Sequence, residues 1–263
     1  AELLRQKTLI LDYISSLATY SATDDQFTIR GVSALTEGSA NISAQMYAAG
    51  VIGYNDPGTY IYFKDVQNNS VVSATKPVAR PEEQIVNGAV RATNYAESAY
   101  TYNYAYAGGI VGKAGKNTVL DNCKNANAEN ISSAGTYLGT LAEVNEGIII
   151  NCNVPFYSNT ERNYVGGLCG LNKATGLIDS CSMDSQHISG GTVVGGITAE
   201  NFGKISNITL SSASLLANTG VGGLYAGYNG VTGEIKLEKN IEGTVTAYGD
   251  YAGIVVGYNT GIL

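Results

Sequence analysis

A nine-residue phrase recurs along the chain, and this repeat restricts the fold more than any other feature of the sequence. Its last positions lie at residues 114, 145, 172, 201, 229 and 259, so the steps range from 27 to 31 residues and average about 29. A periodic unit of this length is typical of solenoids and other repeat architectures. The clearest copies are Tyr47–Asn55, Tyr106–Ala114, Tyr164–Asn172 and Tyr251–Asn259.

A second short strand is expected after each phrase, at residues 117–123, 147–152, 176–181 and 203–208. Its last residue is Cys123, Cys152, Cys181 or Ile208, in successive repeats. Because Ile208 replaces cysteine in this column, we expect a ladder of buried thiols facing the core. A disulfide between adjacent coils is the alternative. Cys169 lies on a different strand of the repeat.

Such a repeat cannot bury its apolar face alone, but stacked copies share one continuous core. We therefore predict an all-β fold, a right-handed parallel β-helix or solenoid with coils of about 29 residues. We place Gly166, Gly167 and Gly170 at tight corners, which need either a positive φ or a close backbone approach. An antiparallel sandwich or a propeller is the alternative, although a propeller blade normally needs about 40 residues.

The two ends of the chain depart from the repeat. Residues 1–30 are predicted to form an N-terminal capping segment, and residues 31–263 the solenoid. Within the first 20 residues, apolar side chains recur at helical spacing, which predicts an amphipathic α-helix across the open end of the first coil. Binding to a partner, or a coiled coil, is the alternative role. The chain stops at Leu263 in mid-coil, so we expect it to be part of a longer protein. The apolar helical positions are Leu3, Leu4, Ile10, Leu11, Ile14 and Leu17.

The step from Asn55 to Ala114 is 59 residues, about two repeats. Two prolines and a charged run favour an insertion at residues 77–103 over a degenerate coil. At the end of this insertion Tyr100, Tyr102 and Tyr104 alternate with smaller residues, and Tyr106 continues the pattern. In a strand these four rings share one face and form a candidate binding platform for a glycan or a host protein. The alternative is that they pack beneath the insertion.

The polar residues form no motif for catalysis or metal binding. The only histidine, His187, is expected at the surface, so zinc-protease and histidine-triad chemistry are not predicted. Asp121 and Asp179 share a repeat column, and we expect both to be solvated. We therefore predict neither a catalytic residue, nor a metal, nor a cofactor.

Charge and hydropathy exclude two classes of partner. The net charge is -7 and the basic residues form no stripe, so nucleic acid is not an expected partner. The apolar runs are far shorter than a membrane span, so we do not expect insertion into a membrane.

The repeat phrases resemble those of the GLUG family. The resemblance rests on Gly108–Gly112, Gly166–Gly170 and Val256–Asn259, each followed by a turn and a short strand, and it covers Tyr47–Leu263. GLUG repeats occur in large secreted or wall-anchored bacterial proteins, including adhesins and the non-catalytic region of IgA-specific metalloendopeptidases. The resemblance thus implies a β-solenoid at the bacterial cell surface or outside the cell.

Together these features predict a non-catalytic structural or adhesive segment that binds a glycan or a host protein. One alternative is a carbohydrate-active β-helix enzyme, a lyase or hydrolase, which would use the few carboxylates. Another is a spacer for a catalytic domain outside this chain.

Overall fold

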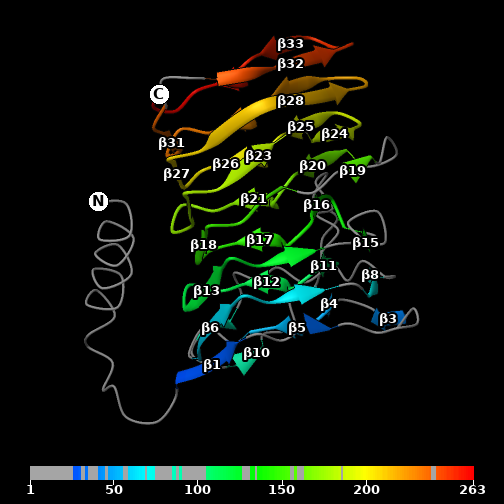
Figure 1. Cartoon of the computed structure of the whole chain (residues 1–263), viewed down its shortest axis with the longest axis vertical. Helices are drawn as coiled ribbons and strands as arrows, with labels where there is room; N and C mark the ends of the chain where they lie inside the picture. Colours follow the sequence, from blue (N-terminus) through cyan, green and yellow to red (C-terminus); the bar gives the residue numbers. More distant parts are fainter. Residues whose placement is uncertain are drawn as a thin grey trace.

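The computed structural model is a stack of short parallel strands that follow one another in sequence order from β1 at one end to β33 at the other (Figure 1). It describes residues 26–30, 33–34, 41–44, 47–55, 59–68, 70–74, 85–86, 89–90, 105–125, 131–133, 135–154, 157–158, 163–184, 186–237 and 241–263. Over these ranges the chain forms strands and turns and no helix. Accordingly, the described part contains no helix able to cross a membrane.

Two seven-stranded parallel sheets run the length of the stack. Sheet 1 consists of β1 (Gln26–Arg30), β6 (Tyr60–Lys64), β13 (Thr118–Asp121), β18 (Ile148–Ile150), β22 (Leu177–Asp179), β27 (Lys204–Ser206) and β31 (Glu234–Ile235). Sheet 2 consists of β5 (Ile52–Tyr54), β12 (Val111–Ala114), β17 (Ala142–Asn145), β21 (Cys169–Asn172), β26 (Thr198–Asn201), β30 (Ala226–Asn229) and β34 (Val256–Asn259).

Shorter sheets complete each coil. Sheet 3 consists of β16 (Tyr137–Gly139), β20 (Tyr164–Gly166), β25 (Val193–Gly195), β29 (Val221–Gly223) and β33 (Tyr251–Gly253). In the early coils β4 (Tyr47–Ala49) and β11 (Tyr106–Gly108) take the corresponding place. The remaining side is made by β2 (Ser33–Ala34), β3 (Asn41–Ala44), β7 (Gln67–Asn68), β8 (Val71–Ala74), β14 (Lys124–Asn125), β15 (Ile131–Ser133), β19 (Tyr157–Ser158), β23 (Ser182–Asp184), β24 (His187–Gly190), β28 (Thr209–Ala217) and β32 (Ile241–Ala247).

The register of sheet 2 follows the repeat phrase. Asn145 pairs with Asn172, Asn172 with Asn201, Asn201 with Asn229, and Asn229 with Asn259. Each coil therefore rises by one sequence repeat of about 29 residues. The prediction of an all-β parallel solenoid is confirmed, and the sandwich and propeller alternatives are wrong.

The core lies inside the coils and is filled by one face of each strand. In sheet 1 the central side chains are aliphatic or aromatic and almost inaccessible, because alternate residues of a strand point to opposite faces. These core residues are Phe63, Leu120, Ile149, Ile178, Ile205 and Ile235.

A left-handed residue turns the chain at the end of most strands of sheet 1. The φ angles there lie between 51° and 57°, and the residues are Asp65, Asn122, Asn151, Ser180 and Asn207. Asparagine and aspartate tolerate this conformation better than most residues. The corner that follows sheet 1 therefore uses short polar side chains rather than glycine.

The glycines of the repeat phrase serve a different purpose. A Cβ atom at Gly167 would lie 1.9 Å from the carbonyl oxygen of Gly196 in the next coil. At Gly166 it would lie 1.8 Å from the oxygen of Cys169. Close backbone approach, rather than a positive φ, thus requires glycine at this second corner.

The long step between Asn55 and Ala114 adds no coil to the stack. Tyr106 pairs directly with Tyr47, and β13 pairs directly with β6. Within residues 77–103 the structure describes only β9 (Ile85–Val86) and β10 (Ala89–Val90), which pair antiparallel with each other. The helix predicted over residues 1–20 lies outside the described residues.

Candidate functional site

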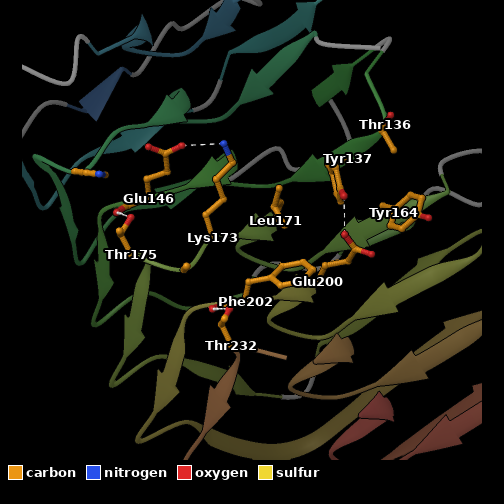
Figure 2. Close-up of a pocket in the computed structure, with 12 residues that line it drawn as sticks. Thr136, Tyr137, Glu146, Tyr164, Leu171, Lys173, Thr175, Glu200, Phe202 and Thr232 are labelled. Carbon is orange, nitrogen blue, oxygen red and sulfur yellow. Dashed lines mark hydrogen bonds and ion pairs between the residues drawn. The ribbon is translucent and has the colours of Figure 1, made fainter. Parts of the chain in front are cut away.

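A groove of about 800 Å³ is the candidate functional site. It lies on the outer surface where sheets 2 and 3 meet, across the coils that contain β17, β21 and β26 (Figure 2). Its volume falls within the range typical of small-molecule sites. The groove is lined by Lys116, Thr136, Tyr137, Glu146, Tyr164, Leu171, Lys173, Ala174, Thr175, Glu200, Phe202 and Thr232.

Aromatic rings form one wall of the groove. Tyr137 and Tyr164 are paired residues of β16 and β20, and their ring centroids are 5.0 Å apart at an interplanar angle of 54°. Both open a repeat phrase, so the stacking of coils places one tyrosine above the other. Phe202, in the turn after β26, contributes a third ring and packs edge-on against Tyr228 at 5.8 Å.

Glu200 lies in the groove between the aromatic wall and Leu171. It lies on the outer face of β26 and is paired with Leu171 of β21. The hydroxyl of Tyr137 donates a 2.5 Å hydrogen bond to Glu200 Oε2, and Figure 2 shows the two side chains pointing toward each other. Burial raises the pKa of the Glu200 carboxyl, and the hydrogen bond from Tyr137 opposes part of this shift.

A charged cluster forms the other end of the groove. Lys173 Nζ lies 2.9 Å from Glu146 Oε1, and Lys113 Nζ lies 3.6 Å from the same oxygen. Glu146 and Lys173 occupy equivalent turn positions, one residue after the asparagine of the repeat, so stacking brings them together. Two ammonium groups thus share the Glu146 carboxylate at this end of the groove.

These features together suit a polar ligand with flat apolar faces. Tyrosine rings offer an apolar face and a polar hydroxyl on the same side chain. The groups at the two ends supply hydrogen-bond donors and acceptors that fix the orientation of a ligand. Among the residues that the structure describes, no group of three histidine, cysteine or acidic side chains could hold a metal ion.

The tyrosines predicted from the sequence lie elsewhere. Tyr106 is 3 % exposed and stacks on Tyr47, with ring centroids 5.0 Å apart and planes within 6°. It is therefore a packing residue, and the prediction that it belongs to an exposed platform is wrong. Tyr100, Tyr102 and Tyr104 lie outside the described residues.

The expectation that Asp121 and Asp179 are solvated is wrong. They are 4 % and 0 % exposed. Asp121 accepts hydrogen bonds from the hydroxyl of Tyr62 and from Asn151 Nδ2, at 2.5 and 2.7 Å. Asp179 accepts one from Asn207 Nδ2 at 2.6 Å. These carboxylates anchor the left-handed corners of neighbouring coils, a role that sequence spacing alone does not reveal.

The cysteine column runs along one edge of the core. Cys123, Cys152, Cys181 and Ile208 are each 1 % exposed, and all four cysteines of the chain are free thiols. The thiol of Cys152 donates to the carbonyl oxygen of Ile150, at 3.2 Å. Burial raises the pKa of the Cys123 and Cys152 thiols and brings that of Cys169 to about 12. The thiolate, which is the reactive form, is thus strongly disfavoured.

His187 is less exposed than the sequence suggested. It lies in β24, is half-buried, and its Nδ1 is 2.8 Å from the hydroxyl oxygen of Ser214 in the next coil. The histidine joins two coils rather than standing free at the surface.

The fold and the groove together define a class, that of parallel β-solenoids with a ligand-sized groove on the outer surface. Comparisons with models of known protein families, with curated proteins and with solved structures found no match. The resemblance to the GLUG family therefore rests on the repeat phrases alone.

Proposed function

We propose that the protein is a non-catalytic, adhesive β-solenoid segment of a secreted or surface-attached bacterial protein, and that its groove binds a glycan. The extracellular setting follows from the resemblance to GLUG repeats. The right-handed sense of the coils follows from the general preference of parallel crossovers. The ligand class follows from the chemistry of the groove.

The observation that carries this proposal is the arrangement of Tyr137, Tyr164 and Glu200. Two rings and a carboxylate converge on one hollow, on rigid strands rather than on loops. Aromatic faces pack against the C–H faces of sugar rings, while the carboxylate and Lys173 can hydrogen-bond to sugar hydroxyls. An adhesive role requires only binding, and the rings, the carboxylate and Lys173 are chemical groups suited to binding a sugar.

A glycan array tests the proposal. The full chain is applied to immobilised neutral and acidic glycans beside a Tyr164→Ala variant and a Tyr248→Ala control, since Tyr248 is 75 % exposed and outside the groove. We expect loss of one stacking ring to weaken binding by about tenfold and the control to bind normally. If the unmodified chain binds no glycan, the protein is a spacer or binds a protein partner, and the proposal is wrong.

One observation favours a carbohydrate-active enzyme as the second candidate. A carboxyl with a raised pKa beside a tyrosine hydroxyl is a typical general acid, and Glu200 and Tyr137 form such a pair. Incubation with neutral and acidic polysaccharides tests this function. The release of new reducing or unsaturated ends, abolished by Glu200→Gln, would replace the adhesive role with a catalytic one.

A further inference from the structure

The outer surface carries further aromatic rings beyond the groove, toward the last coil. We call them the second aromatic cluster, which consists of Tyr228 of β30, Tyr251 of β33 and Tyr258 of β34. The rings of Tyr228 and Tyr258 stack with centroids 5.7 Å apart and planes 18° apart, and the ring of Tyr251 lies 5.2 Å from that of Tyr258. Tyr251 and Tyr258 are 49 % and 46 % exposed, so their faces are accessible to a ligand.

One column of outer side chains connects this cluster to the groove through sheet 3. Tyr251 lies in the same column as Tyr164 of the groove, with Val193 and Val221 between them. Three strand steps separate the two tyrosines, which is about 14 Å along the stack. Val193 is 8 % exposed and Val221 is half-buried. No charged side chain therefore interrupts the column between the two tyrosines.

A second column connects the same two places through sheet 2. Glu200, which lines the groove, pairs with Tyr228, and Tyr228 pairs with Tyr258. Phe202, which also lines the groove, packs edge-on against Tyr228 at 5.8 Å. The hydroxyl oxygen of Tyr228 lies 3.0 Å from Thr260 Oγ1, and this contact helps to hold the ring in place. Aromatic surface thus continues from the groove to Tyr258.

Glycine gives the corner between sheets 2 and 3 the same close packing at both places. Beside the groove, a Cβ atom at Gly170 would lie 2.6 Å from Cβ of Tyr137. In the last coil, a Cβ atom at Gly257 would lie 2.4 Å from Cγ1 of Val221. In both cases an outer side chain of sheet 3 lies directly against the sheet 2 backbone of the next coil. The corner that borders the groove therefore continues to the second aromatic cluster.

We propose that this corner binds a linear polysaccharide lengthwise, with one stretch of the chain in the groove and another on the second aromatic cluster. The inference rests on the proposed glycan binding and adds that the ligand is a long chain aligned with the axis of the solenoid. Each tyrosine offers an apolar face to a sugar ring and a hydroxyl to its polar groups. Contact at both places strengthens binding, because the second contact is made by a chain that is already bound.

The size of the second aromatic cluster favours a sugar chain over a protein partner. Three tyrosines that are at most half exposed offer no more than about 300 Å² of accessible surface. A stable protein interface buries about 800 Å² on each partner. None of the three side chains carries a charge that would steer a protein to this place.

The dependence of affinity on the length of the glycan tests the proposal in the full chain. The probes are size-fractionated linear glycans, with cello-oligosaccharides as the neutral series, hyaluronan fragments as the acidic series, and the series of any linear glycan that the array retains. A disaccharide lies within the groove, whereas long members of a series reach both places. We expect the unmodified chain to bind the long members at least about tenfold more tightly than the disaccharide.

Tyr251→Ala removes one ring of the second aromatic cluster. We expect this variant to bind the long members about three- to tenfold more weakly and the disaccharide as tightly as the unmodified chain does. Tyr248→Ala is the matched control, because Tyr248 lies in the same coil, is 75 % exposed and is outside the cluster. Tyr164→Ala, in the groove, weakens the binding of both lengths.

The disaccharide separates failure of this inference from failure of the proposed function. Equal affinity of the unmodified chain for short and long members overturns the inference and leaves glycan binding in place. If Tyr251→Ala loses affinity for both lengths, Tyr258→Ala repeats the comparison. A second loss at both lengths, or no loss in either variant, also overturns the inference. If no member of any series binds, glycan binding itself is wrong and the inference falls with it.

Discussion

The asparagine that ends each repeat phrase forms an amide ladder through sheet 2. Asn172 Nδ2 donates to Asn201 Oδ1 at 2.8 Å and Asn172 Oδ1 accepts from Asn145 Nδ2 at 2.9 Å, all in the interior. Ala114 interrupts the ladder, and there Asn55 donates to the hydroxyl of Thr118 instead. Amide ladders of this kind also stabilise other stacked parallel strands.

We predict that Asn172→Ala lowers the free energy of unfolding by about 2–4 kcal/mol, because it leaves one donor and one acceptor buried without partners. The comparison variant is Asn259→Ala at the exposed end of the ladder, which removes only one contact of the ladder, the acceptor of Asn229 Nδ2. Denaturant titration should show a loss of about half that of Asn172→Ala for this variant. Equal losses for the two variants would show that the ladder does not stabilise the fold.

Glu200 predicts a pH dependence of stability. Its folded pKa is raised above the ordinary value of 4.5, so the folded state holds the proton more tightly than the unfolded state does. The contribution of Glu200 to stability is therefore most favourable below 4.5 and falls as the pH rises through the raised pKa. Glu200→Gln removes the loss of stability at high pH, because glutamine does not ionise. Its side-chain oxygen can still accept the hydrogen bond from the Tyr137 hydroxyl.

We expect the melting temperature of Glu200→Gln to exceed that of the unmodified chain at about pH 8 and to approach it at about pH 4. Thermal denaturation of the two proteins across this range measures the difference. A variant that is less stable than the unmodified chain at about pH 8 would show that the carboxylate is stabilised in the folded state.

At the scale of the strand and corner, the glycines of the repeat phrase allow the backbones of neighbouring coils to come into close contact. A side chain at Gly167 would collide with the backbone of Gly196 and with the side chain of Val154. We predict that Gly167→Val destabilises the fold by about 3 kcal/mol or more, whereas Lys173→Ala costs under about 1 kcal/mol. Similar melting temperatures for the two variants would contradict the strand register that places Gly167 against Gly196 of the next coil.

The sequence predicted the strands of sheets 1 and 2 because their repeat is local and periodic. It placed Asn172 and Asn201 in one column and Cys123 and Cys152 in another, as pairing shows. It did not predict the burial of Asp121, because the side chains that surround this carboxylate, Tyr62 and Asn151, come from the coils on either side.

The sequence did not predict the groove for a related reason. Tyr137 and Tyr164 open their repeat phrases, so an outward tyrosine column was visible in the sequence. Whether this column lies beside Glu200 and Phe202 depends on how sheets 2 and 3 join at a corner. The spacing of residues within one repeat does not specify that geometry.

At the scale of the whole molecule, the groove spans several coils, so its shape depends on the stacking of the solenoid. Tyr137, Glu146, Tyr164, Lys173 and Glu200 come from three successive repeats, yet they line one hollow. Stacked repeats often present extended binding surfaces of this kind. A ligand bound there would contact neighbouring coils at once and slow the local opening of all of them.

Hydrogen–deuterium exchange of the full chain, with and without a bound oligosaccharide, tests the location of the binding site most directly. Binding in the groove predicts slower exchange in β16, β20, β21 and β26 and in the turns that follow β17, β21 and β26, with no change in the last coil, residues 241–263. Protection confined to that last coil, or absent from the groove strands, would contradict it.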